Sequence, residues 1–433
     1  MKNKIGVVGL WHLGCVISAS WAKLGGVVVA VDFDEERIQK LSQGISPIYE
    51  PGLDEILKEG VDNGSIQFSS APSSLSSCDY VFIAHDTPVG EDDMPNISGV
   101  EDDFNKIISH LKDGALIIVS AQLAVGVARR LRKRLKSENA SLELVYSPEN
   151  LRLGEAINCY TNPGHIVIGG DTEDAINSAT KLFANIPCTM VKMNLPSAEM
   201  AKHGINSYLA VSVGLTNELA NQCERSGASI SDVVSVMRLD PRIGKSAYLS
   251  AGIGYSGGTL GRDLAVLDSK GSELFKTPWI INGARRGNAE RFSYPAQRLK
   301  KELSNINGSN LALLGMTYKA GTSTLRRSLP LAIATDFAGQ GAMIRIFDPK
   351  ADWSEMPEID RIQIFGDAYS CAHGVDAILL LTDWPEFLDL DFIKLKNQMR
   401  GNLIFDTKGQ LSSKYDHLER LGLKILAVGR GDM

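Results

Sequence analysis

The chain has 433 residues, of which 44% are hydrophobic and 22% charged, a composition typical of folded globular proteins with two or three domains. Its formal net charge is −6, and no block of Lys and Arg provides the basic surface that a nucleic-acid groove or an anionic membrane attracts. The first residues, MKNKIGVVGL, do not have the form of a signal peptide, and no apolar run reaches transmembrane length. We therefore expect a cytoplasmic protein with neither a nucleic-acid nor a membrane partner.

The cysteines and histidines predict no metal site. Six cysteines are scattered without CxxC pairs, and the seven histidines include no HExxH pattern. This distribution favours reduced thiols over a disulfide framework. His203 is interpreted as a packing residue.

In chain order, short β-branched runs alternate with helical patterns from residue 4 to about residue 195. This alternation predicts a mostly parallel sheet with helices on both faces. The expected strands lie in KIGVVGL, GGVVVAVD, DYVFIAHD, GALIIVSA, LELVYSP, HIVIGG and CTMVKM.

One unusually long helical pattern follows, in PSAEMAKHGINSYLAVSVGLTNELANQCERSG. A helix of this length usually connects domains or forms a dimer contact. Strands return after about residue 300, in NLALLGMTYK, MIRIFDP, VDAILLLTDW and NLIFDTKG. The first of these strands echoes the start of the chain, because both halves read as strand, glycine turn, helix, and a strand that ends in Asp. The predicted fold class is α/β, with two Rossmann-like doubly wound domains joined by a long central helix and a helical middle domain.

The turn GLWHLG follows the first expected strand, and Asp32 ends the next strand, 32 − 9 = 23 residues after Gly9. In this context a helix N-terminus binds a pyrophosphate and the acidic side chain accepts hydrogen bonds from ribose, which favours NAD. The middle glycine of the usual pattern is replaced by Trp11. A βαβ turn that binds no nucleotide therefore remains an alternative.

A series of motifs resembles the UDP-glucose/GDP-mannose dehydrogenase family in order and spacing over nearly the whole chain. The resemblance implies three domains: NAD-binding at 1–195, helical dimerisation at 196–300 and UDP-sugar-binding at 301–433. It also implies a homodimer that oxidises the 6-hydroxyl of a UDP-sugar to a carboxylate, with two NAD per turnover, for polysaccharide precursors. The motifs are DEERIQKLSQGISPIYEPGLDEIL, DTP, SPENLRLGEA, NPGHIVIG, AEMAKHGINSYLA, LDPRIG, GYSGGTLGRD, GMTYKAGTSTLRRS and FDPK.

Lys202 and Asn206 are four residues apart on the long helix and share one face. They match the catalytic lysine and asparagine of the family, where the lysine stabilises a developing oxyanion. Glu149 follows a strand and matches a glutamate that acts as a general base or orients water, and Asp263 matches an aspartate that works with the lysine and asparagine. A solvated helix face and a surface salt bridge are the plain alternatives for Lys202 and Glu149.

The family places a nucleophilic cysteine four residues before this aspartate, and here that position is Thr259. Oxidation of an alcohol to an aldehyde needs only hydride acceptance and proton removal. Oxidation of the aldehyde to the acid proceeds through a thiohemiacetal and a thioester, and a hydroxyl has no comparable route to a nucleophile without a dedicated base. Thr259 therefore predicts impaired four-electron oxidation.

Other departures also indicate a changed redox centre. Gln122 replaces a usual threonine, Arg262 replaces a lysine, and the acidic pair of the TSTLRRS segment is missing. Arg242 matches an arginine that reaches the substrate of the neighbouring subunit, although a plain helix-terminal arginine fits its spacing equally well. The segments LTDWPEF and FDTKGQL are interpreted as packing, with Lys408 in place of an arginine.

The complete predicted site follows from these motifs. The cofactor-binding residues are Gly9, Trp11, His12, Leu13, Gly14, Asp32, Thr87, Gln122 and Arg262. The substrate-binding residues are Glu149, Asn150, Leu151, Lys202, Arg242, Tyr248, Gly254, Lys319 and Arg326.

The leading hypothesis is an NAD-dependent nucleotide-sugar dehydrogenase. Three alternatives remain open: chemistry that stops at two electrons or epimerises the sugar, a sugar-nucleotide-binding protein without turnover, and use of a distant thiol such as Cys159 or Cys223.

Overall fold

The computed structural model describes the chain except residues 1–2, 88–89, 91–93, 95, 275–277 and 432–433, and it leaves the side chains of 257, 259 and 269–274 undescribed. It divides into two compact units, residues 1–205 and 206–433, each of which is described by itself. The division into 1–195, 196–300 and 301–433 remains a prediction.

The N-terminal unit is built on an eight-stranded sheet of order β3-β2-β1-β4-β5-β6-β7-β8. Neighbouring strands are parallel except β6 and β7, which meet in an antiparallel bridge. The chain reverses direction across the sheet between β1 and β4, which is where open α/β sheets bind ligands. The strands are β1 Lys4–Val8, β2 Val27–Val31, β3 Ile66–Ser69, β4 Tyr80–Ile83, β5 Leu116–Val119, β6 Glu143–Tyr146, β7 His165–Gly169 and β8 Thr189–Met193.

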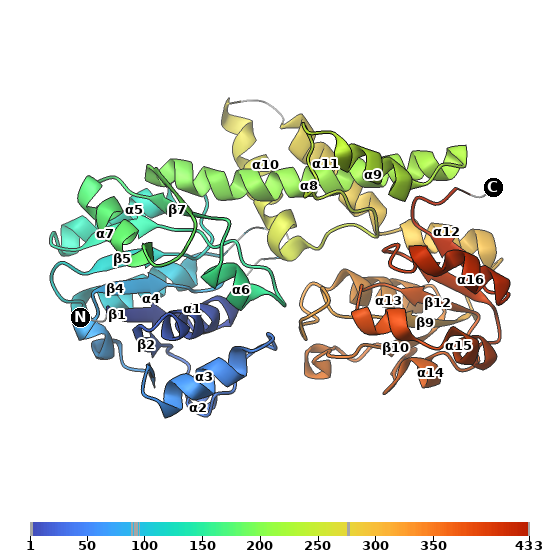
Figure 1. Cartoon of the computed structure of the whole chain (residues 1–433), viewed down its shortest axis with the longest axis horizontal. Coiled ribbons are helices and arrows are strands. Elements are labelled where there is room, and N and C mark those ends of the chain that lie inside the picture. Colours follow the sequence, from blue (N-terminus) through green and yellow to red (C-terminus); the bar gives the residue numbers. More distant parts are fainter. Residues whose placement is uncertain (1–2, 88–89, 91–93, 95, 275–277, 432–433) are drawn as a thin grey trace. The chain divides into compact units, whose positions relative to one another are not determined.

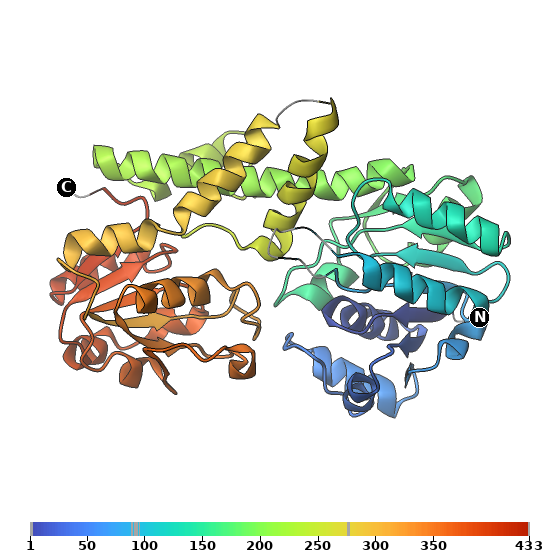
Figure 2. The ribbon, with the colours of Figure 1, turned by 180° about the vertical axis from the view of Figure 1, so that it is seen from behind.

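Helices cover both faces of this sheet (Figures 1 and 2). Alternate strand residues point to opposite faces, so Val7 joins the core under α1, whereas Val8 joins the core under α4 and α5. Strands buried on both faces explain the nearly continuous apolar runs of the sequence. The helices are α1 His12–Lys23, α2 Glu35–Leu41, α3 Leu53–Asp62, α4 Ser98–Ile107, α5 Val127–Glu138, α6 Ala156–Thr161 and α7 Glu173–Phe183.

Helix α8, Leu195–Ser226, has 32 residues and at 1.5 Å per residue is about 48 Å long. Its last turns contribute Ala220 and Cys223 to the core of the C-terminal unit. None of the helices in the described ranges combines the length and apolarity that a bilayer crossing needs. The helices that follow are α9 Ile230–Leu239, α10 Arg262–Leu274, α11 Trp279–Arg291 and α12 Tyr294–Glu302.

The C-terminal unit has a six-stranded parallel sheet of order β11-β10-β9-β12-β13-β14. Helices α12 and α13 pack on one face, and α14, α15 and α16 pack on the other. The strands are β9 Asn310–Leu314, β10 Met343–Phe347, β11 Ile362–Ile364, β12 Ala377–Leu380, β13 Leu403–Asp406 and β14 Lys424–Ala427. The remaining helices are α13 Leu329–Gly339, α14 Ala368–Cys371, α15 Phe392–Gln398 and α16 Tyr415–Arg420.

The predicted fold class is confirmed: two mostly parallel sheets and a long central helix are present. The sequence analysis did not predict β3, β11 and β14. These strands have three or four residues, and they lie at or next to a sheet edge, where an apolar run is not required.

Candidate functional site

The carboxyl ends of five neighbouring strands in the N-terminal unit carry several predicted cofactor residues and, after β6, the predicted catalytic residue Glu149. Gly9 follows β1, Asp32 follows β2, Thr87 lies beyond β4, Gln122 lies beyond β5, and Glu149 lies beyond β6. Because β2, β1, β4, β5 and β6 are adjacent in this order, these residues lie along one edge of the sheet.

The first turn requires glycine at two positions. Gly9 has φ of +87°, and a Cβ there would lie 2.8 Å from the Cα of His85. A Cβ on Gly14 would lie 1.9 Å from the carbonyl oxygen of Gly9, so only glycine lets α1 begin this close to the turn. The α1 helix starts at His12, and its N-terminal N–H groups therefore point toward the sheet edge, as they do in pyrophosphate sites.

The carboxylate of Asp32 lies at the centre of this turn. It accepts a hydrogen bond from the Leu10 N–H at 2.6 Å, and both of its oxygens lie within 3.0 Å of Arg37 Nη1. The Arg37 guanidinium carbon lies 5.5 Å from the centroid of the Trp11 ring, a cation–π distance. The ring of Trp11 is therefore placed beside Arg37, at the carboxyl end of β2.

The sequence analysis missed two residues near this edge, Glu50 and His85. His12 Nε2 lies 2.9 Å from Glu50, whose buried carboxylate also accepts from the N–H groups of Gly154 and Ala156. Glu50 thus joins the start of α1 to the segment before α6. Glu50 belongs to the segment DEERIQKLSQGISPIYEPGLDEIL, but nothing in the sequence indicates that its partners lie more than one hundred residues away.

His85 is the second missed residue. Its Nδ1 lies 2.8 Å from a carboxylate oxygen of Asp103 in α4. This hydrogen bond raises the pKa of the His85 imidazole above its ordinary value, against the opposing effect of burial. His85 lies two residues before Thr87, and a histidine directly after a strand at the switch point was the available signal.

The turn, the helix N-terminus and the carboxylate after β2 fit a dinucleotide. A Cβ at either glycine would collide with the neighbouring backbone and break the tight turn, and Asp32 is placed to accept from ribose hydroxyls. Leu13, Thr87 and Gln122 are buried. These residues would hold NAD along the edge from β2 to β5.

Lys202 contacts two of the predicted substrate residues, Glu149 and Asn150. Its ammonium nitrogen lies 2.5 Å from the backbone oxygen of Glu149, 3.3 Å from Asn150 Oδ1 and 3.8 Å from Glu149 Oε1. The Leu151 N–H donates to the other carboxylate oxygen of Glu149. Lys202 is only 6% exposed, so this is not the solvated helix face of the plain alternative.

Asn206 lies one turn further along α8 and is described with the C-terminal unit. Its side-chain amide donates to the carboxylate of Asp263, and both side chains are buried. Arg262 and Asp263 begin α10, directly after the π-helical turn Gly257–Gly261. The side chain of Thr259 lies outside the described part of the structure.

A cavity of about 210 Å³ in the C-terminal unit brings together Tyr248, Gly254 and Lys319, which the sequence predicted as substrate residues. Asp383 and Lys408 also line it. Burial lowers the pKa of the Lys408 ammonium, and the nearby charge of Asp383 opposes this effect.

The C-terminal segments LTDWPEF and FDTKGQL thus contribute more than packing. The packing interpretation is correct for Trp384 and Leu411, which are buried in the core. Asp383 and Lys408 of the same segments also line the cavity.

The two remaining predicted arginines do not line this cavity. Arg326 lies 3.6 Å from Glu355, and its side chain is largely exposed. Arg242 is exposed and pairs with Asp240 at 2.7 Å. A role for either residue in substrate binding remains a prediction.

The thiols and histidines form no further centre in the described residues. Cys223 is buried in the core of the C-terminal unit, and Cys159 is half-buried in the N-terminal unit. His203 is buried and its Nε2 lies 3.1 Å from the backbone oxygen of Leu123. Among the described side chains, no group of His, Cys, Asp and Glu is arranged to hold a metal ion.

Known proteins match the chain along its whole length. Sequence models of the UDP-glucose/GDP-mannose dehydrogenase family match residues 3–187 as the NAD binding domain, 196–290 as the central domain and 312–413 as the UDP binding domain. A UDP-glucose 6-dehydrogenase from Rickettsia bellii is 30% identical over 98% of this chain and 98% of its own length.

Two solved structures have the same fold. A UDP-glucose dehydrogenase from Pyrobaculum islandicum superposes with a TM-score of 0.89 at 25% identity, over 100% of this chain and 98% of the other. A UDP-D-ManNAc dehydrogenase from Pyrococcus horikoshii gives 0.87 at 25% identity, over 99% and 100%. With the dinucleotide turn of one unit and the lysine-lined cavity of the other, these matches show that the chain belongs to the UDP-glucose/GDP-mannose dehydrogenase family and is an NAD-dependent nucleotide-sugar dehydrogenase.

Proposed function

We propose that the chain oxidises the 6-hydroxyl of a UDP-sugar and that the oxidation stops after two electrons. The observation that carries the substrate assignment is the cavity in which Tyr248, Gly254 and Lys319 meet Lys408. The ammonium groups of two lysines can pair with a diphosphate, and tyrosine rings can pack against a base or a sugar ring. The UDP binding domain that matches residues 312–413 supports the same substrate class.

In this proposal Lys202 stabilises the oxygen of the sugar's C6 as its proton leaves. The ammonium already binds the backbone oxygen of Glu149 and lies 3.8 Å from its carboxylate, so a water or the substrate hydroxyl could be shared between the two side chains. NAD, when bound, accepts the hydride from C6. Asp263 holds the amide of Asn206 in one orientation, which leaves the amide oxygen to position the substrate oxygen.

The limit of two electrons rests on Thr259. The first step removes one hydride and one proton from the alcohol and leaves an aldehyde. The second oxidation adds the oxygen of water and removes another hydride, and in the family it passes through a thioester. A threonine hydroxyl is a far weaker nucleophile than a thiolate at neutral pH. We therefore propose an aldehyde product. Return of the hydride to C6 would only restore the alcohol, and an epimerised sugar would require oxidation of a ring carbon instead.

The test is the stoichiometry of NADH. Purified protein with NAD and UDP-glucose, and with UDP-N-acetylmannosamine in parallel, is expected to give at most one NADH per sugar and no uronic acid by mass. Thr259→Cys is expected to raise the yield to two NADH with an acid product, and the matched Thr259→Ser is not. Two NADH and an acid from the unaltered chain would contradict the proposal, and binding of UDP-sugar without any NADH would favour a non-catalytic protein or an internal hydride return.

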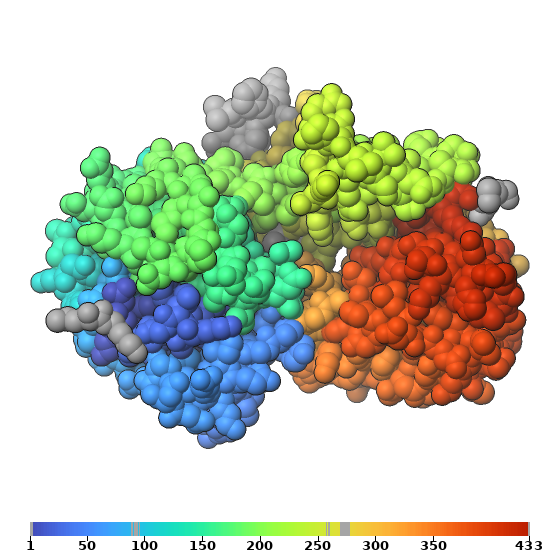
Figure 3. All heavy atoms as spheres, viewed as in Figure 1, coloured from blue at the N-terminus to red at the C-terminus, as the bar shows by residue number. Residues whose placement is uncertain are grey.

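We also propose a homodimer. Helix α9 presents Val236 and Leu239 with 69% and 73% of their surface exposed, and the yellow-green residues of this region lie at the surface in Figure 3. Apolar side chains exposed to this degree on one helix are typical of a covered surface. Sedimentation should show a dimer that Leu239→Asp converts toward monomer, whereas a monomeric unaltered chain would contradict it. The cytoplasmic location remains a prediction.

A further inference from the structure

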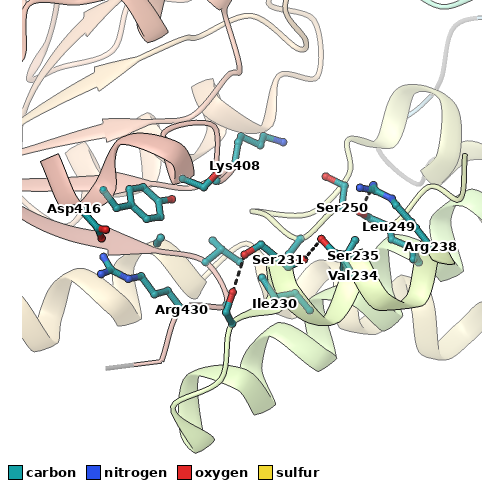
Figure 4. Close-up of a pocket in the computed structure, with 18 residues that line it drawn as sticks. Ile230, Ser231, Val234, Ser235, Arg238, Leu249, Ser250, Lys408, Asp416 and Arg430 are labelled. Carbon is teal, nitrogen blue, oxygen red and sulfur yellow. Dashed lines mark hydrogen bonds between the residues drawn. The ribbon is translucent and has the colours of Figure 1, made fainter. Parts of the chain in front are cut away.

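A second and larger cavity lies in the C-terminal unit beside α9, with a volume of about 540 Å³ (Figure 4). In the close-up, Ser231, Ser235 and Arg238 of α9 lie on one side, and Asp416 and Arg430 lie on the other. It is distinct from the smaller cavity that we assign to the UDP-sugar. No step of the proposed reaction uses it.

The lining of this larger cavity is polar and positively charged. It contains three cationic side chains, Arg238, Lys408 and Arg430, and one carboxylate, Asp416, among the residues described. It is also rich in hydroxyl groups, which can donate or accept hydrogen bonds. These belong to Ser229, Ser231, Ser235, Ser250, Ser412 and Tyr415.

Arg238 is the cation of α9 in this lining, and its polar contacts are to backbone carbonyl groups. Its guanidinium donates to the backbone oxygens of Leu249 at 3.0 Å and Ala247 at 3.4 Å. No ion pair joins it to a carboxylate within the described residues. Arg430, by contrast, forms an ion pair with Glu419 at 2.7 Å. A half-buried arginine that binds only carbonyl oxygens attracts an anion.

We propose that this cavity is a second binding site, for a small organic phosphate. The phosphate would bind Arg238, and the serine hydroxyls would hydrogen-bond to hydroxyl groups of the organic part. The volume lies in the range of about 300–1,000 Å³ that is usual for small-molecule sites. The inference goes beyond the proposed function, because it concerns a cavity that the reaction does not need.

The two cavities share a wall, and this links the second site to substrate binding. Ser250, Ala251 and Lys408 line both of them. Arg238 holds the backbone of this wall through the oxygen of Leu249. An anion that takes donors from Arg238 would loosen the wall and change the shape of the substrate cavity. The effect must be reciprocal, so that UDP would also change the affinity for the phosphate ligand.

The first test is calorimetric titration of the full chain with glucose 6-phosphate at low salt, without NAD or UDP-sugar. We expect saturable binding that Ser235→Asp weakens by about tenfold or more, because a carboxylate on the rim repels the anion. The matched control Ser235→Asn should bind within about twofold of the unaltered chain, since it adds bulk without charge. Both variants change an exposed residue of α9 and should fold.

Three results would overturn the site: no binding, equal binding by the Asp and Asn variants, or loss of binding in Lys319→Gln. The last would place the ligand in the substrate cavity, where Lys319 lies and Ser235 does not.

The second test measures the affinity for UDP with and without glucose 6-phosphate. We expect about a threefold or larger change in the Kd of UDP for the unaltered chain, and none for Ser235→Asp. An unchanged Kd beside proven binding of the sugar phosphate would overturn the coupling. Failure of UDP to bind at all would count against the proposed function alone, because the first titration decides the second site independently.

Discussion

After its first strand, each sheet makes a turn on a glycine with positive φ, +87° at Gly9 and +89° at Gly315. In each turn the glycine approaches a residue just beyond the fourth strand of its sheet in chain order, β4 or β12. A Cβ would lie 2.8 Å from the Cα of His85 in the N-terminal sheet and 2.6 Å from the Cβ of Thr382 in the C-terminal sheet. The internal echo in the sequence therefore corresponds to the same backbone device in both sheets.

The two turns differ in what surrounds the aspartate that ends the next strand. Asp348 is buried, and one of its oxygens accepts from two backbone N–H groups of the turn and from the indole of Trp384 at 3.0 Å. Asp32 accepts from one backbone N–H of the turn and from Arg37, a side chain on the surface of α2. The Trp384 indole is buried in the core and cannot move aside for a ligand, whereas the Arg37 side chain at the surface can.

The helix that follows the turn differs as well. It begins at His12 in the N-terminal unit, 12 − 9 = 3 residues after the glycine, and at Leu329 in the C-terminal unit, 329 − 315 = 14 residues after it. Only the first turn therefore lies against a helix N-terminus that can bind a pyrophosphate. The two sheets therefore share the turn, but only in the N-terminal sheet does the carboxylate have a partner that a ligand can displace. In the C-terminal sheet the residues just beyond the turn, Tyr318 and Lys319, line the smaller cavity instead.

The largest expected effect tests the structural role of Asp348. Asp348→Ala should lower the free energy of unfolding by about 3–5 kcal/mol, because it leaves several buried donors without an acceptor. Urea unfolding measures the loss. Asp32→Ala should lose less, about 1–2 kcal/mol, since Arg37 can turn to water. Equal losses in the two variants would mean that the two aspartates do not differ in role.

The second prediction concerns NAD affinity, for which Asp32 should matter more than Asp348. Asp32→Ala should weaken NAD binding by about 10–100-fold, because hydrogen bonds from ribose hydroxyls to a carboxylate contribute about 1.5–3 kcal/mol. Calorimetric titration with NAD measures the change, and Asp348→Asn is the matched control, in which the affinity should stay within about twofold. An unchanged affinity in Asp32→Ala would show that the cofactor lies elsewhere.

The third prediction concerns the contact between Trp11 and Arg37 in the first turn. Its ring lies 5.5 Å from the Arg37 guanidinium carbon, and a cation–π contact near the surface contributes about 0.5–1 kcal/mol. Trp11→Ala should therefore loosen Arg37 and weaken NAD binding by about two- to fivefold. Trp11→Phe should retain most of the affinity. Tighter binding by Trp11→Ala would instead show that the ring obstructs the cofactor.

The smallest effect concerns pH. The folded protein holds the pKa of His85 above its unfolded value through Asp103, so the stability from this pair is present below about pH 6.5 and is lost as pH rises through the raised pKa. Asp103→Asn should cost a few tenths of a kcal/mol more at pH 6 than at pH 9, after screening by solvent.

The corresponding residue of the other sheet provides the control. Thr382 donates to the backbone oxygens of Gly315 and Thr317 and does not titrate in this range. Thr382→Val should therefore destabilise the protein equally at both pH values. An equal loss of stability at both pH values in Asp103→Asn would contradict a charged His85–Asp103 pair.

Sequence periodicity predicted the strands buried on both faces, because such burial demands continuous apolar residues. It could not predict β11, whose IQI leaves Gln363 and Ile364 exposed. In the site, the spacing from Gly9 to Asp32 was sufficient, because both residues are close in sequence to the strands that place them. Contacts such as Glu50 with Gly154 depend on distant segments, and no local pattern encodes them.

The resemblance predicts Tyr248, Gly254 and Lys319 as substrate residues, and all three line one cavity, where their role remains a prediction. It did not reveal that Lys408 turns into that cavity while Trp384 turns into the core, because the position of a residue after a strand does not fix the direction of its side chain.

The burial of the native thiols makes the chain well suited to chemical labelling. In residues 206–433, Cys223 and Cys371 are buried, and burial raises the pKa of Cys371 to about 12. The two half-buried cysteines, Cys159 and Cys188, belong to the other unit. A maleimide adduct on a proteolytic peptide from residues 206–433 of Thr259→Cys would therefore report the introduced thiol, and its rate against pH would give the acidity of that thiol in its own surroundings.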